Sequence, residues 1–395
     1  MRSLRQTTEI TTEYHAFIDC EALALRYHFG EERILKAARN LSREAFLRLF
    51  LSFHGMKPIG RWQSHTYVKI VDSLTDEKHF FLIPIPRTAN GEVPHIRLVN
   101  NRVCVDEFMT DIVPQSIPYT TPFWYFHYNP NREDTPFYSM TLNLSPSCSE
   151  KCTLCAGAKT GRVNNGMDET LPVHTFVDGI FDQYPEAGKQ LENMAIVTGC
   201  FDDFNQMYNH LKAAQIAVRK HANPQTFAVL EHNIVTEDDY EKIVGELGFD
   251  VYITLECFDQ EMRNIALNGK VGRKGRDSRE FIEMARTYAN YLDARPHLGK
   301  HLVHVTYLVG IDSLEVTQEF FRQLDEINKT LKHTKVIPWM SIFTPYNEPM
   351  KIIQRKDFSL SFLYQVMDMA ETYFGKELMV NSSGGTQHGY ARGLY

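Results

Sequence analysis

The sequence predicts an α/β fold, a partial (β/α)6 barrel that is TIM-like but open on one side, preceded by an N-terminal α+β module. Three observations support this prediction. From about residue 139 onward, short apolar runs alternate with longer amphipathic runs, as in repeated strand–helix units around a parallel sheet. Six such units can be counted, whereas a closed barrel of this kind needs eight. Before residue 135 the pattern differs, with helical stretches followed by short strands.

Residues 1–135 are expected to form the α+β module. Helical patterns cover 21–40 and 43–54. Short β-type runs separated by turn sequences then predict a small antiparallel meander, with strands at 66–71, 80–85, 96–99 and 103–105. The aromatic run at 123–128 is expected to pack between this module and the next, and a substrate-facing role is the alternative.

Residues 136–375 are expected to form the barrel, and residues 376–395 a glycine-rich tail that is either disordered or folded over the barrel mouth. The expected strands are 139–144, 194–198, 226–230, 251–255, 302–309 and 336–343. The expected helices are 173–191, 204–221, 237–247, 278–292, 314–331 and 360–374. In such barrels the active site lies at the C-terminal ends of the strands, so chemistry is expected at those ends.

Composition argues against several classes of protein. The formal net charge of −7 lacks the basic excess of a protein that binds phosphate backbones, so nucleic acid is not an expected partner. There is no run of eighteen apolar residues and no apolar core of a secretory signal, so a cytoplasmic protein without a membrane partner is expected. The seven cysteines, an odd number, favour metal or redox chemistry over a disulfide framework.

Three of these cysteines stand close together directly after the first expected barrel strand. Cys148, Cys152 and Cys155 form a CxxxCxxC pattern. Thiolates suit iron–sulfur clusters, and a short loop can bring three of them to three corners of a 4Fe-4S cube. No fourth cysteine is nearby, which leaves one iron open for a substrate or cosubstrate. The alternative is a structural zinc site completed by a histidine such as His174.

The motif, its position after a first strand and the six-unit pattern resemble the radical SAM superfamily over about residues 139–350, and the later segments resemble its biotin synthase branch. The resemblance implies an oxygen-sensitive enzyme with one 4Fe-4S cluster on the three cysteines and S-adenosyl-L-methionine (SAM) at the open iron. One-electron reduction of SAM then gives methionine and a 5′-deoxyadenosyl radical that abstracts hydrogen from the substrate. The residue before the last cysteine, usually aromatic in the family, is Leu154 here.

The resemblance also implies SAM-binding residues after the second and fourth barrel strands. Gly199 matches a glycine turn that receives the SAM ammonium group. Asp202 or Asp203 stands near the position of a family glutamate, with capping of the following helix as the alternative. Glu256, at the end of the fourth strand, is expected to accept hydrogen bonds from the ribose hydroxyls.

Further candidates lie later in the chain. Arg276, in a basic loop with Lys270, Arg273 and Lys274, is expected to pair with a carboxylate of SAM or substrate. The fifth strand ends in Val309 and Gly310, which resemble the apolar contact beneath adenine. Candidate pocket residues of the sixth strand segment are Trp339, Met340 and Tyr346, with core packing as the alternative for the first two.

The expected reaction is hydrogen abstraction from a small, amino-acid-like or specialised metabolite, followed by cleavage, rearrangement or coupling. Cys257 and Tyr346 are the candidates for catalytic residues, and a reductant such as flavodoxin or ferredoxin is the expected protein partner. No cysteine follows Cys257, which disfavours the cysteine-rich extension of peptide-modifying relatives. A peptide- or protein-modifying radical SAM enzyme is the first alternative, and a non-catalytic zinc protein is the second.

Overall fold

The computed structural model describes the following residues: 19–28, 31–40, 46–47, 50, 53, 65–71, 78–84, 96–99, 102–110, 113–115, 124–127, 137–143, 152–154, 173–197, 199, 201, 203–231, 233–268, 271, 276–343, 350, 352–375 and 378.

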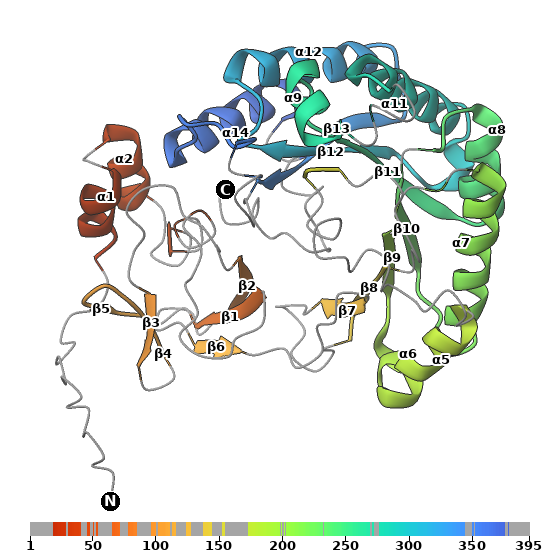
Figure 1. Cartoon of the computed structure of the whole chain (residues 1–395), viewed down its shortest axis with the longest axis horizontal. Helices are drawn as coiled ribbons and strands as arrows, with labels where there is room; N and C mark the ends of the chain where they lie inside the picture. The colour runs from red at the N-terminus through yellow and green to blue at the C-terminus, as the bar shows by residue number, and fades with distance from the viewer. Residues whose placement is uncertain are drawn as a thin grey trace, which may run out of the picture.

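A seven-stranded sheet with the order β13-β12-β11-β10-β9-β8-β7 forms the centre of this described part. Its strands are β7 (Trp124–His127), β8 (Ser139–Asn143), β9 (Asn193–Val197), β10 (Thr226–Glu231), β11 (Phe249–Glu256), β12 (Leu302–Val309) and β13 (Lys335–Ile342). Strands β8 to β13 are parallel, and β7 pairs antiparallel with β8. Because β7 and β13 are the two edges, the barrel stays open, and the predicted fold class is confirmed (Figure 1).

Helices follow the parallel strands and lie along the outside of the curved sheet (Figure 1). They are α5 (Val173–Gln183), α6 (Ala187–Gln190), α7 (Phe204–Arg219), α8 (Glu237–Tyr240) continued by a π-helix (Glu241–Glu246), α9 (Gln260–Ala266), α11 (Ser278–Asp293), a 3-10 turn (Pro296–Leu298), α12 (Leu314–Asn328) and α14 (Leu360–Phe374). Most of these helices start on a side chain that accepts a hydrogen bond from the first turn. Such caps are Asp203, Thr236, Asp259, Asp277, Ser313 and Ser359.

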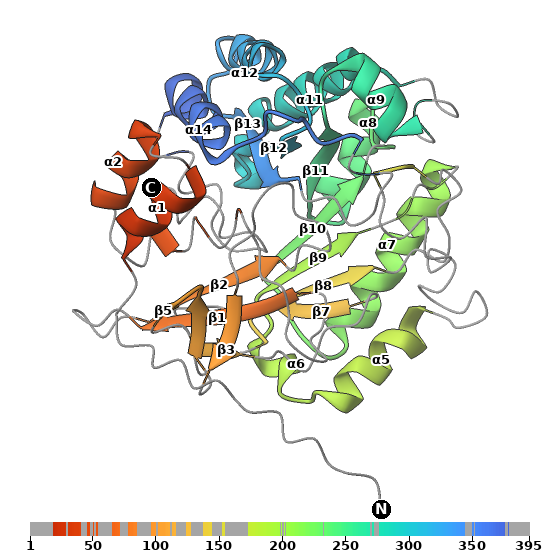
Figure 2. The ribbon, with the colours of Figure 1, turned by 60° about the vertical axis from the view of Figure 1, so that its left-hand side comes forward.

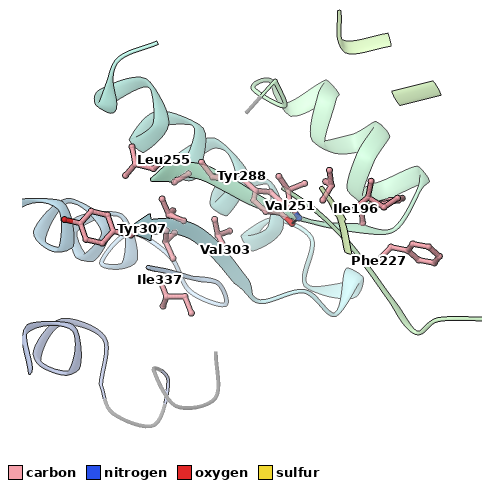
Figure 3. Packing of buried hydrophobic residues seen from close by; sticks show 14 of the residues in the cluster. Ile196, Phe227, Val251, Leu255, Tyr288, Val303, Tyr307 and Ile337 are labelled. Atoms are coloured by element: carbon pink, nitrogen blue, oxygen red, sulfur yellow. Dashed lines mark hydrogen bonds between the residues drawn. The ribbon is translucent and has the colours of Figure 1, made fainter. Parts of the chain in front are cut away.

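The hydrophobic core lies between the sheet and these helices. Along β12, the exposed fraction alternates, with Val303, Val305, Tyr307 and Val309 buried and the residues between them partly exposed. This period of two places one face of the strand against α11 and α12. Figure 3 shows members of this cluster, from Ile196 on β9 to Tyr307 on β12. The opposite face of the strands therefore points into the barrel interior.

The N-terminal part has more helices and strands than predicted. The expected helix at 21–40 is divided into α1 (Cys20–His28) and α2 (Glu32–Asn40), and the described residues between 43 and 54 are helical. Its strands are β1 (His65–Val71), β2 (Lys78–Pro84), β3 (Ile96–Val99), β4 (Arg102–Val105), β5 (Phe108–Met109) and β6 (Val113–Gln115). They form two antiparallel three-stranded sheets, β2-β1-β6 and β3-β4-β5, where the sequence predicts one meander.

The N-terminal helices dock on the last barrel helix. Arg33 of α2 forms an ion pair with Asp368 of α14, and the rings of Phe53 and Phe358 lie 5.4 Å apart. Leu23 of α1 is fully buried in the main hydrophobic cluster. Figure 2 shows α1 and α2 beside α14, with the small sheets at the open side of the barrel. Contacts distant in the sequence thus join the two parts.

Three further features differ from the prediction. Residues 124–127, expected as part of an aromatic run that packs between the N-terminal module and the barrel, form strand β7 of the main sheet, so that sheet begins before residue 135. The expected helix at 173–191 is interrupted between α5 and α6, and α9 was not predicted. Apart from Leu378, the predicted tail at 376–395 lies outside the described residues. No described helix is long and apolar enough to cross a membrane.

Candidate functional site

The described part of the cysteine motif lies at the carboxyl end of the sheet. Cys152 is 5% exposed and belongs to a small apolar cluster, which we call the carboxyl-edge cluster. Its buried members are Cys152, Cys257, Ala266, Leu267, Ile311, Phe343, Met350 and Ile353. Cys257, Ile311 and Phe343 follow β11, β12 and β13, so Cys152 lies at the ends of these three strands.

Two hydrogen bonds fasten this loop. The backbone N–H of Leu154 donates to the carbonyl of Ala266 at 2.8 Å, and the N–H of Thr153 donates to Oδ1 of Asn268 at 3.0 Å. Leu154 also packs against the carboxyl-edge cluster. The end of α9 therefore holds the motif loop in place next to Cys152.

Strand β11 ends in a strained turn at Glu256. The N–H of Cys257 donates to the carbonyl of Leu255 at 3.0 Å, which closes a three-residue γ-turn. Glu256 is the central residue, and its φ is +72°. A γ-turn with positive φ is rare for a residue other than glycine and costs about 1–3 kcal/mol. The pairing of β11 with β12 shifts register between Ile253 and Glu256, so a bulge precedes the turn.

A buried arginine supports the turn from the helix side. Nη1 of Arg263, on α9, donates to the carbonyl of Leu255 at 2.5 Å and to that of Cys257 at 3.0 Å. Its guanidinium lies 4.6 Å from the ring of Phe281, and the residue is fully buried. Its Nε and Nη2 have no hydrogen-bond partner. Burial lowers the pKa of Arg263, which means that removal of the guanidinium from water disfavours its charged form.

Asp312 ties the end of β12 to the same turn. Its carboxylate accepts hydrogen bonds from the N–H of Phe258 at 2.6 Å and of Asp259 at 3.2 Å. The side chain is almost fully buried, and burial raises its pKa. Burial also raises the pKa of Cys257, so this neighbour of Glu256 carries a protonated thiol. The backbone around Glu256 is thus held on both sides.

The other predicted residues have different surroundings. Asp203 caps α7, accepting from the N–H of Asn205 at 2.5 Å. Arg276 is partly buried and contacts the sulfur of Met284 at 3.9 Å. Gly199 is partly buried after β9.

Gly310 leaves β12 with φ +107°, and a Cβ there would lie 3.1 Å from the ring of Phe358. Both the backbone conformation and the close ring therefore favour glycine at this position.

Strand register separates the candidates on β12 and β13. Val309 is almost fully buried on the face that packs against the helices. Met340 aligns with Tyr307 and so lies on that same face, whereas Trp339 aligns with Thr306 and lies on the interior face. Trp339 is therefore on the interior face of the barrel, and Met340 is on the face that packs against the helices.

The remaining candidates lie outside the described residues, namely Cys148, Cys155, Asp202, Lys270, Arg273, Lys274 and Tyr346. Among the described residues, no three His, Cys, Asp or Glu side chains gather as a metal site. His174, the zinc alternative, is exposed near the start of α5.

Sequence reasoning missed Arg263 and Asp312. An arginine at the fourth position of a short helix has no distinctive local pattern, and its neighbours do not reveal that it is fully buried. Asp312 follows a strand end, which is a usable signal, but Ser313 next to it is the actual helix cap. Their roles follow only from contacts across α9, β11 and β12.

Together these features define an α/β protein with an open six-unit barrel and with Cys152 at the carboxyl ends of three of its strands. No family model matches the chain, and no curated protein matches it.

Solved structures similar to this chain include two of the same kind of protein. One is the X-ray structure of the FeFe-hydrogenase maturase HydG from Carboxydothermus hydrogenoformans, with 14% identity and a TM-score of 0.43 over 67% of this chain and 58% of that chain. The other is a crystal structure of HydG, a maturase of the FeFe-hydrogenase, with 15% identity and a TM-score of 0.39 over 59% of this chain and 50% of that chain. This chain thus spans between half and three fifths of those chains.

Proposed function

We propose that this protein is a radical SAM enzyme with one 4Fe-4S cluster on Cys148, Cys152 and Cys155. The observation that carries the proposal is the position of the motif loop. It follows β8, the first parallel strand, and its described residues 152–154 are fastened over the carboxyl ends of β11, β12 and β13. Active sites of parallel barrels lie at this end of the strands.

The surroundings of Cys152 suit such a cluster. The side chain is nearly buried among Ile311, Phe343 and other apolar groups, which keep water from a sulfur ligand. Cys148, Cys152 and Cys155 would hold a 4Fe-4S cluster, which would supply the electron for reductive cleavage of SAM to methionine and a 5′-deoxyadenosyl radical. The three thiolates match the preference of iron–sulfur clusters for soft ligands.

We assign the SAM ribose to Glu256. Its neighbour Cys257 belongs to the same cluster of side chains as Cys152, so the Glu256 backbone is close to the proposed iron site. The strained turn indicates that a carboxylate is kept where glycine is the easier residue. Arg276 is proposed to pair with a carboxylate of SAM or substrate, and Gly199 to receive the SAM ammonium group.

The substrate is proposed to be a small, amino-acid-like or specialised metabolite that loses a hydrogen atom before cleavage, rearrangement or coupling. The small-substrate proposal rests on the resemblance of the later segments to the biotin synthase branch. A flavodoxin or ferredoxin is the proposed source of the electron, and Cys257 and Tyr346 remain the candidates for catalytic residues.

Anaerobic reconstitution with iron and sulfide tests the proposal. We expect about four irons per chain, and formation of 5′-deoxyadenosine when SAM and dithionite are added. Cys148→Ala, Cys152→Ala and Cys155→Ala should each abolish 5′-deoxyadenosine. Cys20→Ala, in α1 and outside the motif, is the matched control and should retain it. About one zinc per chain and no iron, or full product from a motif variant, would contradict the proposal.

A further inference from the structure

The interior face of the barrel strands is not fully packed. On β12, Leu302, His304, Thr306 and Leu308 are partly exposed, although the residues between them are buried against helices. Tyr252 on β11 and Trp339 on β13 are also partly exposed and lie on this face. Because β11 and β12 are central strands, this exposed surface faces the barrel interior.

Three polar atoms at this interior face have no hydrogen-bond partner. They are Oγ1 of Thr254, Oγ1 of Thr306 and Nε2 of His304, and each atom is buried. Tyr252 aligns with His304 across β11 and β12, and Thr254 and Thr306 each follow two residues later. An unsatisfied buried polar atom costs about 1–3 kcal/mol, so three at adjacent positions call for an explanation. A ligand that supplies their partners is such an explanation.

Aromatic rings form a rigid wall next to these atoms. The ring of Tyr252 stacks on His304 with centroids 4.6 Å apart and planes 7° apart. The same ring contacts Trp339 at 4.5 Å with an angle of 59°. A flat ligand gains both ring contact and burial of apolar area on such a wall.

The rings of Tyr252, His304 and Trp339 lie on the amino-end side of the proposed iron site at Cys152. Leu308 packs against the carboxyl-edge cluster that contains Cys152. Thr306 is two residues toward the amino end of the same strand, a distance of roughly 7 Å along the strand. A molecule bound on this face is therefore within reach of a radical formed at the mouth.

No uncompensated charge lies among the described residues at this level of β11, β12 and β13. Burial lowers the pKa of His304 to about 4, so the imidazole is neutral at pH 7. Asp250, two residues from Tyr252 toward the amino end, is paired with Lys300. Glu256 stands at the mouth. A carboxylate or phosphate placed beside Thr254 and Thr306 would lose its water without gaining a cation, which is strongly unfavourable.

We propose that this face, defined by Tyr252, Thr254, His304, Thr306 and Trp339, binds a flat, uncharged part of the substrate that carries a hydroxyl, carbonyl or amide group. The two threonine hydroxyls and the imidazole bond to that group, and any charged end of the substrate points toward the mouth. The inference rests on the proposed radical SAM function and narrows its substrate class.

A pair of probes of equal shape tests the charge preference. Para-hydroxybenzamide is neutral, and para-hydroxybenzoate is an anion at pH 7. We expect the amide to bind the reconstituted holoenzyme at least about tenfold more tightly than the carboxylate, as measured by ligand-observed NMR titration. Equal or tighter binding of the carboxylate overturns the proposal. So does the absence of binding of the amide at about 10 mM, a weak affinity for a molecule of this size.

Two threonine variants test the location. Thr306→Val keeps the shape and removes one unpartnered hydroxyl, so the protein should fold and amide binding should weaken about fivefold. Thr334→Val is the matched control, because the hydroxyl of Thr334 is also buried and unpartnered but precedes β13 at the amino end. It should leave amide binding unchanged. Unchanged binding in Thr306→Val overturns the location.

Iron content and SAM binding separate this inference from the proposed function. Both should be normal in Thr306→Val, because Thr306 does not belong to the carboxyl-edge cluster that contains Cys152. If the wild-type protein binds no iron, the proposed function fails. If it binds iron and SAM normally but shows no preference for the amide, only the substrate inference fails.

Discussion

The ends of β11 and β12 both have a residue with positive φ, but the two residues are of different types. Both strands turn away with positive φ, β12 at Gly310 with +107° and β11 at Glu256 with +72°. At Gly310 the ring of Phe358 leaves no room for a side chain. At Glu256 a side chain is kept in a strained conformation and held by Arg263 and Asp312 through its neighbours.

The difference between Gly310 and Glu256 suggests a different reason for each residue. Glycine removes the strain where only a turn is needed. A glutamate at positive φ beside Cys257 gains no stability from its backbone, which supports the proposal that its carboxylate binds SAM. The same reasoning makes Arg263 a positioning residue, because it contacts the carbonyls on either side of Glu256.

The largest expected effect comes from removing the buried arginine. Arg263→Met deletes two charge-assisted hydrogen bonds to Leu255 and Cys257, and partly relieves the burial of a charge. We expect a net loss of about 3 kcal/mol in the free energy of unfolding, with weaker SAM binding. Urea denaturation and equilibrium dialysis with SAM measure the two effects. Arg286→Met, a change at a partly exposed position on α11, should cost less than about 0.5 kcal/mol. Equal losses in both variants would contradict a specific role for Arg263.

A smaller loss is expected at the end of β12. Gly310→Ala introduces a Cβ at φ +107° and about 3.1 Å from Phe358, so stability should fall by about 2 kcal/mol. Thermal unfolding provides the measurement. Gly179→Ala, in α5 with open space around it, is the control and should be neutral or slightly stabilising. An unchanged Tm in Gly310→Ala would show that the two strand ends do not share the same constraint.

The smallest effect has the opposite sign. Glu256→Gly should stabilise the fold by up to about 1 kcal/mol by relieving the turn, yet abolish tight SAM binding. Glu256→Gln keeps the strained backbone, so it should weaken SAM binding without the gain in stability. The pair is compared by thermal unfolding and by SAM titration. If Gly and Gln variants are equally stable, the turn at Glu256 is not strained.

Much of the barrel could be predicted from local signals. The strands and most helices of the barrel lie within a few residues of their expected positions, because apolar periodicity and residues such as Asp277 and Ser359 mark them in the sequence. The boundary between the N-terminal module and the barrel was harder to predict. Strand β7 lies before the expected boundary, yet it pairs with β8 of the barrel sheet. The helical pattern of 21–40 also did not predict its division into α1 and α2.

By itself, the sequence determined the order of strands and helices, the count of six units and the cysteine motif after the first strand, because these features depend on neighbouring residues. The tertiary structure alone decided which side chains meet Cys152, that Arg263 supports the turn at Glu256, and that Trp339 and Met340 face opposite sides. The physical reason is that register, the bulge in β11 and helix docking are set by long-range packing, which a pattern along the chain does not encode.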